Sequence, residues 1–200
     1  MIRIFDIFFS LIGLIFLSPL LILLWFIGLL DNGSPLFIQK RVGRNLQSFI
    51  LIKFRTMPKK TRSVGTHLIE DIKLSSFGYF LRRTKIDEIP QLFNVLLGDM
   101  SLVGPRPCLL NQRKLISERK KRGVFKVKPG ITGLAQISGI GMISPTLLSK
   151  TDIKMIKKMS LSNYFYYIFT TIVQIIKQNF KISIPLFFTI CGLLLILINS

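Results

Sequence analysis

Residues 7–30 form a run of 24 uncharged, mostly apolar positions near the N-terminus. At about 1.5 Å of rise per residue, a helix of this length can span a bilayer. Ser18 and Pro19 interrupt the run near its middle. Because proline removes a helical hydrogen bond, we expect a kink there. Two topologies follow: a kinked helix that crosses the membrane, or a sharply broken one that enters and returns on the same side.

The charge of the chain indicates what this segment meets. The 200 residues include 28 Lys and Arg but only 9 Asp and Glu, a net charge of +19, although half of the residues are apolar. A protein that faces the cytoplasm on an anionic membrane combines these properties, and the positive-inside rule places the basic body in the cytoplasm. Nucleic acid is the rival partner for so basic a chain, and the apolar terminal segments argue against it.

Two adjacent carboxylates, Asp87 and Glu88, lie in the segment LRRTKIDEIPQLFNVLLGDMSLVGPRP at 81–107. Pro90 suits the first turn of a helix over QLFNVLL, and Gly98 suits its end, followed by a loop to residue 107. One interpretation is that the pair caps this helix and complements its dipole. The other is that Asp87 acts as a nucleophile and Glu88 as a ligand of a hard cation such as Mg²⁺, beside a phosphate held by arginines.

Several motifs in this chain resemble the bacterial sugar transferases, the monotopic polyprenyl-phosphate phosphoglycosyl transferases. The resemblance rests on the segment at 81–107, with support from RVGRN at 41–45, KFRTM at 53–57 and KPGITGLAQISG at 128–139. It covers roughly residues 1–165. In that family the Ser–Pro break makes a re-entrant helix, so the resemblance favours the second topology for Ser18 and Pro19.

The resemblance implies transfer of a sugar-1-phosphate from a UDP-sugar to polyprenyl phosphate, with release of UMP. Asp87 would form a phosphosugar intermediate, and Glu88 would help to hold Mg²⁺. Other basic side chains implied near the phosphates are Arg82, Arg106, Arg83, Lys53 and Arg55. The expected partners are the UDP-sugar, the polyprenyl phosphate and anionic lipids, at the cytoplasmic face of the bacterial inner membrane. A non-catalytic membrane scaffold of polysaccharide assembly is the rival hypothesis, because several positions depart from the family pattern: Lys85, Leu134, Met155 and Tyr164.

The remaining segments predict a mostly helical α+β fold. A β-hairpin is expected within 31–57, a polar loop with His67 over 58–76, and a short basic helix at 77–83. Amphipathic helices follow within 109–128, where headgroup contact is expected, and within 144–181. The aromatic residues at 164–167 suit a membrane interface.

We therefore expect three parts: a membrane helix over 1–30, a cytoplasmic catalytic domain with interfacial helices over 31–181, and a C-terminal hydrophobic membrane segment over 182–200. Cys108 and Cys191 lie far apart and indicate neither a disulfide framework nor a CxxC metal site. The sequence leaves open which sugar is transferred and whether the chain forms a homo-oligomer.

Overall fold

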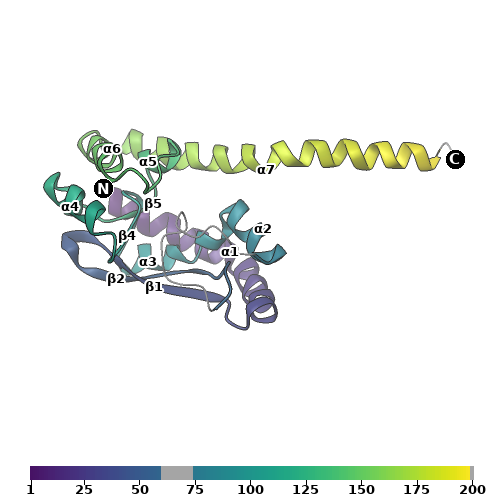
Figure 1. Cartoon of the computed structure of the whole chain (residues 1–200), viewed down its shortest axis with the longest axis horizontal. Helices are drawn as coiled ribbons and strands as arrows, with labels where there is room; N and C mark the ends of the chain where they lie inside the picture. The colour runs from purple at the N-terminus through teal and green to yellow at the C-terminus, as the bar shows by residue number, and fades with distance from the viewer. Residues whose placement is uncertain (60–73, 199–200) are drawn as a thin grey trace.

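The computed structural model describes the backbone of residues 1–59 and 74–198, and the side chains of these residues up to 179. Figure 1 shows many helices together with two small sheets, which confirms the mostly helical α+β class. The predicted loop over 58–76 and His67 fall largely outside the described residues, and so do the side chains of the predicted C-terminal segment.

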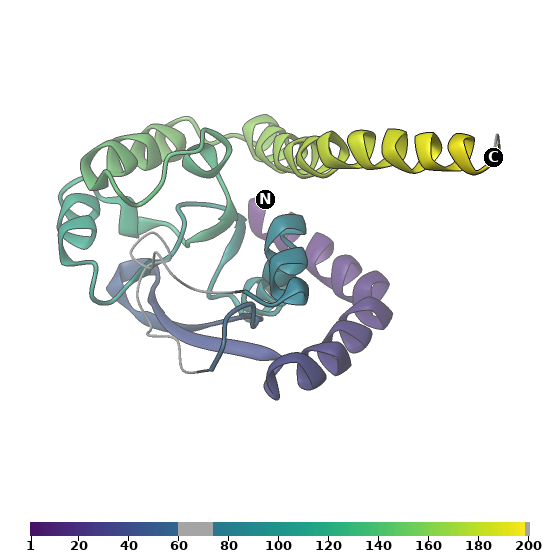
Figure 2. The same ribbon diagram turned by 45° about the vertical axis from the view of Figure 1, so that its right-hand side comes forward.

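Helix α1 (Ile2–Asn32) contains the apolar run and is assigned as helix throughout, with Pro19 inside it. The Ser18 hydroxyl donates a hydrogen bond to the Ile15 carbonyl over 2.7 Å, in the turn before the proline. Figures 1 and 2 show that α1 bends part-way along its length, consistent with the predicted kink. Gly33 ends the helix in the left-handed conformation, with φ of 63°.

One side of α1 packs against the rest of the protein. Leu14 and Leu24 are buried, and so are the small or polar residues Asp6, Ser10 and Gly28. Many large apolar side chains elsewhere on the helix are exposed, among them Phe8, Phe16, Ile22, Leu23 and Phe26. Among the residues whose side chains the structure describes, up to 179, α1 alone forms a helix long and apolar enough to cross a membrane. Its exposed apolar surface indicates that the protein is associated with a membrane.

The predicted hairpin is present. Strand β1 (Leu36–Val42) pairs antiparallel with β2 (Ser48–Phe54) around the short 3₁₀ turn η1 (Arg44–Leu46), and β4 (Cys108–Leu109) adds to the other edge of β1.

Strand β3 (Ser101–Val103) pairs in parallel with β5 (Gly130–Thr132). Strand β3 lies in the segment before residue 107 that the sequence predicted as a loop, and β5 lies in the motif at 128–139. Each is only three residues long, so its pairing depends on a partner distant in sequence rather than on local periodicity.

Helices α2 (Ser76–Thr84) and α3 (Gln91–Leu97) confirm the two helices predicted around the acidic pair. Gly98 ends α3 with φ of 93°, as expected. The buried Asn94 attaches α3 to the edge of β2: its Oδ1 accepts from the Ile52 N–H at 3.1 Å and its Nδ2 donates to the Ile50 carbonyl at 2.6 Å. This pairing fixes the acidic turn before α3 beside the hairpin.

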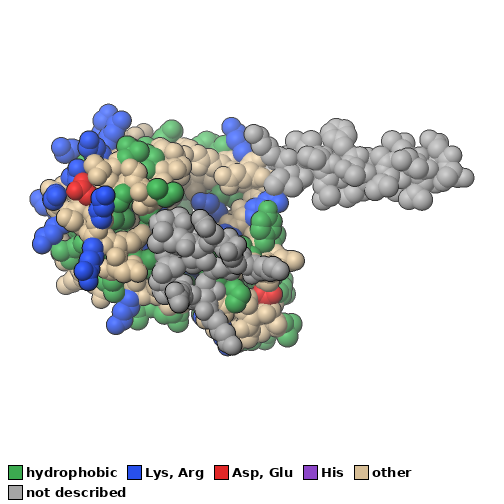
Figure 3. Space-filling model, in the orientation of Figure 1, with side chains coloured by type: hydrophobic (Ala, Val, Ile, Leu, Met, Phe, Trp, Pro, Cys, Tyr) green, Lys and Arg blue, Asp and Glu red, His purple; other side chains and the backbone are tan. Residues whose placement is uncertain are grey.

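The basic helix predicted within 109–128 is α4 (Arg113–Lys121), followed by η4 (Val124–Lys126). Not every basic side chain of α4 is available to lipid headgroups, because Arg119 is buried, with 1% of its surface exposed. The exposed lysines of α4 and of α6 (Pro145–Lys157) belong to a basic region at one end of the molecule in Figure 3.

Helix α5 (Leu134–Ile137) precedes α6, and α7 (Leu161–Ile198) extends well beyond the rest of the protein (Figure 1). The aromatic cluster at 164–167 is only partly interfacial. Tyr164 and Tyr167 are buried, whereas Tyr166 and Phe165 are exposed. The Tyr164 hydroxyl donates to the buried Asp6 carboxylate at 2.9 Å, which joins α7 to α1.

Candidate active site

Asp87 and Glu88 lie in the 3₁₀ turn η3 (Ile86–Glu88), between α2 and α3. Lys85 adopts the left-handed conformation before this turn, with φ of 59°. Neither carboxylate caps α3, because this helix begins after Pro90 without a side-chain capping hydrogen bond. Asp87 is instead turned inward, with 4% of its surface exposed. An acidic side chain buried in this way needs cations to stabilise its charge.

The nearest cation to Asp87 comes from the hairpin. Lys53 on β2 places its Nζ 4.0 Å from Asp87 Oδ2, and the same ammonium lies over the Phe37 ring, 5.4 Å from its centroid. Burial, and after it the charge of the neighbouring Glu88, raises the pKa of Asp87 to about 6, against the opposing effect of Lys53 and two arginines. At neutral pH Asp87 is therefore mostly ionised, although burial makes its ionised form less stable than it would be in water.

Glu88 is paired directly with Arg106, whose Nη2 donates to Glu88 Oε1 at 3.0 Å. Burial alone would raise the pKa of Glu88, but the charge of Arg106, the charge of Lys85 and the hydrogen bond from Arg106 together lower it. The pKa of Arg106 is raised by the Glu88 charge. The two adjacent carboxyl groups therefore have pKa values shifted in opposite directions, an arrangement typical of sites where neighbouring acids have different roles.

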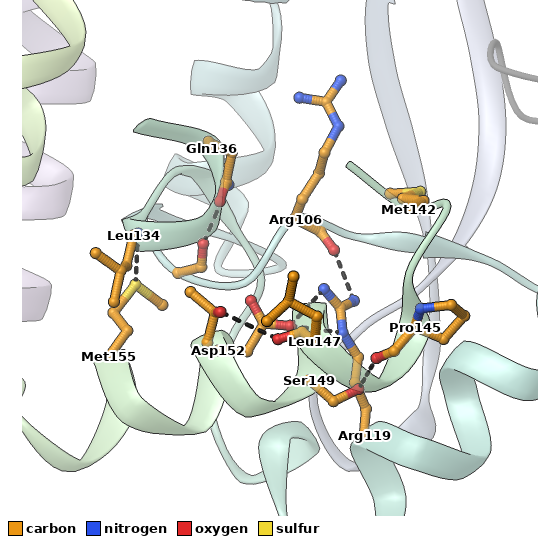
Figure 4. A network of polar contacts seen from close by, with 12 residues as sticks. Arg106, Arg119, Leu134, Gln136, Met142, Pro145, Leu147, Ser149, Asp152 and Met155 are labelled. Carbon is orange, nitrogen blue, oxygen red and sulfur yellow. Dashed lines mark hydrogen bonds and ion pairs between the residues drawn. The ribbon is translucent and has the colours of Figure 1, made fainter. Parts of the chain in front are cut away.

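The turn that presents Arg106 is held from both sides. Arg41 on β1 donates to the Pro107 carbonyl at 3.2 Å, and Arg119 on α4 donates to the Arg106 carbonyl at 2.7 Å. Arg119 is in turn fixed by Asp152 on α6: its Nε donates to Asp152 Oδ2 at 2.9 Å, and its Nη2 lies 2.8 Å from the same oxygen in an ion pair. Figure 4 shows the Arg106 carbonyl directed at Arg119 while its side chain extends the opposite way. The buried pair therefore positions the backbone of Arg106.

A small cleft of about 20 Å³ lies where the hairpin, the acidic turn and the Arg106 turn meet. Its lining includes Lys53, Glu88, Arg106, Arg41 and Gln91. Arg41 and Gln91 were not predicted as site residues. In the sequence Arg41 is one of several basic residues in the hairpin, and its charge does not set it apart from them. Only the pairing of β1 with β4 brings Arg41 to this cleft. Three cations around one carboxylate form a site suited to phosphate groups.

Comparison with known proteins agrees with this arrangement. Residues 1–178 match the family described as bacterial sugar transferase. The chain belongs to this family.

Relatives of this sugar transferase include an uncharacterized sugar transferase, EpsL, of Bacillus subtilis, 48% identical over 58% of this chain and 57% of the relative. The undecaprenyl-phosphate galactose phosphotransferase of Salmonella typhimurium is 34% identical over 88% of this chain and 40% of its own length. The exopolysaccharide production protein ExoY of Rhizobium meliloti is 33% identical over 85% and 83%, respectively. The chain thus spans 57% and 40% of the first two of these relatives, and most of the third.

The other basic residues predicted for the site differ in their positions in this sugar transferase. Arg82, in the last turn of α2, is close enough for its charge to lower the pKa of Asp87. Arg83 lies beside it and makes no ion pair with the described residues. Arg55 donates instead to the carbonyls of Ser34 and Leu36, each at 3.2 Å, and so secures the chain entering β1.

The acidic pair provides the oxygen ligands that the sugar transferase could offer to Mg²⁺. No group of three or more potential metal-binding side chains occurs among the described residues. Mg²⁺ needs no such cage, because it often binds one or two carboxylates, several waters and the phosphates of a substrate. The donor set therefore fits Mg²⁺ bound together with a diphosphate substrate.

Proposed function

We propose that this protein transfers a sugar-1-phosphate from a UDP-sugar to a polyprenyl phosphate, undecaprenyl phosphate in bacteria, and releases UMP. The observation that carries the proposal is the buried Asp87 beside Lys53, next to the Glu88–Arg106 pair. The printed names of the Salmonella relative and of a UDP-galactose-lipid carrier transferase of Erwinia amylovora support the same class of donor and acceptor. This reaction would be the first membrane step in the synthesis of a polysaccharide or glycoconjugate.

Asp87 is the proposed nucleophile. With a pKa of about 6, it is mostly ionised at neutral pH. Its carboxylate oxygen attacks the phosphorus that carries the sugar, and the bond from that phosphorus to the bridging oxygen breaks, so that UMP leaves with that oxygen and the electron pair. A phosphate oxygen of the acceptor then attacks the same phosphorus and displaces the Asp87 carboxylate, which returns to its starting state.

The surrounding cations bind and orient the phosphate groups. Arg106 and Arg82 are suited to bidentate contacts, and Lys53 stabilises negative charge beside Asp87. Glu88, with Asp87 beside it, would hold Mg²⁺, which would neutralise the diphosphate and stabilise the leaving group. The hydrogen bond from Arg106 leaves Glu88 Oε2 as the oxygen not used in the ion pair.

The packing of α1 supports the re-entrant topology and a cytoplasmic active site. Near its start, Arg3 donates to the Val95 carbonyl at the end of α3, and Asp6 accepts from the Leu102 N–H. Near its end, Gly28 lies against Pro35 and Phe77. Both ends thus contact one polar domain, and a helix that crossed the bilayer would separate them by the hydrocarbon thickness of about 30 Å. The exposed lysines of α4 and α6 are suited to anionic headgroups on the same side.

A screen for UMP release tests this function. The purified protein is incubated with Mg²⁺, undecaprenyl phosphate and each of a panel of UDP-sugars, with Asp87→Asn as the inactive control. We expect release with at least one donor, and donor alone should label the peptide that contains Asp87. Failure of every donor, with the protein folded and in lipid, would favour a non-catalytic scaffold. Glu88→Gln should weaken the dependence of rate on Mg²⁺, and an unchanged dependence would contradict its role as ligand.

A further inference from the structure

A second cavity, of about 210 Å³, adjoins the catalytic cleft and is bounded by η3, α3, β5, α5 and α7. Glu88 and Ile131 line both this cavity, here called the α7 groove, and the catalytic cleft. The α7 groove therefore opens directly at the carboxylate beside the proposed nucleophile. A ligand in it would have one end at the reacting groups.

The walls of the α7 groove are mainly aliphatic. Leu92 comes from α3, Ile137 from α5, and Ile168, Ile172 and Ile175 from α7. Most polar groups in the wall bond within the protein: the Thr132 and Thr171 hydroxyls contact each other, and Gln174 Nε2 donates to the Ile137 carbonyl at 2.8 Å. Gln136 Nε2 donates to the Gly104 carbonyl at 3.3 Å, and its Oε1 is the one buried side-chain oxygen of the described wall without a partner. Such a surface suits a hydrocarbon and offers little to the ribose and base of a nucleotide.

Charge distinguishes the two ends of the groove. Lys85 and Glu88 lie at the catalytic end, where Arg106 pairs with Glu88. At the other side α7 carries exposed apolar residues, including Phe169, Ile172 and Ile176. The groove thus leads from cations suited to a phosphate toward an apolar surface suited to lipid.

We propose that the α7 groove binds the isoprene units next to the phosphate of the polyprenyl acceptor, with the phosphate at Lys85 and Arg106. This inference rests on the proposed function and assigns a binding site to the acceptor, one of its two substrates. A second apolar concavity, of about 620 Å³, lies inside the bend of α1, but its lining contains no charged residue to match a phosphate. Hydrocarbon in the α7 groove would leave the cations of the catalytic cleft available to phosphate groups.

Ile172→Trp, which fills the groove, and Ile176→Trp form a matched pair of test variants. The two positions are one turn apart on α7 and are exposed to 49% and 52%, but only Ile172 lines the groove. We expect Ile172→Trp to raise the KM for undecaprenyl phosphate about tenfold, because the acceptor loses apolar contact area. Ile176→Trp should leave this KM unchanged.

Exchange of labelled UMP into the UDP-sugar, measured without acceptor, tests the reaction with the donor separately from the binding of the acceptor. Ile172→Trp should exchange at the wild-type rate. If wild-type protein fails to exchange, the proposed function fails. If exchange is normal and the KM for undecaprenyl phosphate is the same in Ile172→Trp, the groove assignment is wrong.

A crosslinking measurement on the wild-type protein does not depend on the folding of a variant. A polyprenyl phosphate with a diazirine on its first isoprene units is irradiated with the protein in lipid, and the modified peptides are identified. Labelling within residues 168–175 supports the assignment. Labelling confined to residues 14–26, inside the bend of α1, would overturn it.

Discussion

Replacing Asp87 with asparagine should stabilise the fold at neutral pH while it abolishes transfer. Burial, and then the charge of Glu88, raises the pKa of Asp87 from 3.8 to about 6, and nearby cations only partly offset this. Because the native pKa is above the unfolded one, ionisation destabilises the native state. This loss of stability is absent below the pKa of Asp87 in the unfolded chain, and it is complete above its native pKa of about 6. A difference of about two pKa units, at about 1.4 kcal/mol each, gives a gain of about 3 kcal/mol for Asp87→Asn.

Thermal unfolding in detergent at two pH values measures this gain. For a chain of this size, about 3 kcal/mol corresponds to a rise in Tm of about 6–12 °C at about pH 7.5, and the rise should shrink toward about pH 4. UMP release measured on the same samples should be absent for Asp87→Asn.

Glu88→Gln provides the matched control, because its expected effect has the opposite sign. Burial would raise the pKa of Glu88, but Arg106 and Lys85 lower it below 4.5, so its ionised form stabilises the native state. This stability is present above the unfolded pKa and is lost as the pH falls through the native one, so Glu88→Gln should lower Tm at neutral pH. A lower Tm for Asp87→Asn at about pH 7.5, or a gain equal at both pH values, would refute the reasoning.

Three further substitutions test the surroundings of the pair. Lys53→Met removes the ammonium 4.0 Å from Asp87, so the acid limb of the pH–rate profile should move up by about one unit; an unmoved midpoint would argue against this contact. Asp152→Asn leaves a buried arginine without its carboxylate and should cost about 3–5 kcal/mol in urea unfolding, whereas a cost near zero would contradict a buried ion pair. Gly104→Ala would place a Cβ 2.6 Å from the Lys128 carbonyl oxygen, where β3 and β5 approach, and should cost about 1–3 kcal/mol. Gly141→Ala, which meets nothing within 4 Å, should be neutral, and equal stability of the two glycine variants would refute the close approach.

Local patterns in the sequence were sufficient for several elements. The apolar run at 7–30 predicted α1, because length and hydropathy are properties of a single segment. Pro90 and Gly98 predicted both ends of α3, and alternating residues predicted the hairpin of β1 and β2. The adjacent carboxylates and the motif around them indicated the family before any geometry was known.

Contacts between distant segments decided the rest. Sequence alone could not show that Arg119, one basic residue among 28 Lys and Arg, is buried with Asp152. Nor could it show that Tyr164 is turned inward to Asp6, or that Arg55 bonds to backbone carbonyls, away from the cleft. The chemical type of a side chain is the same on the surface and in the core, whereas its burial and partners depend on which strands and helices pack against it. The opposite pKa shifts of Asp87 and Glu88 arise in this way, because Lys53 and Arg106 reach them from a hairpin and a turn that only the folded chain brings together.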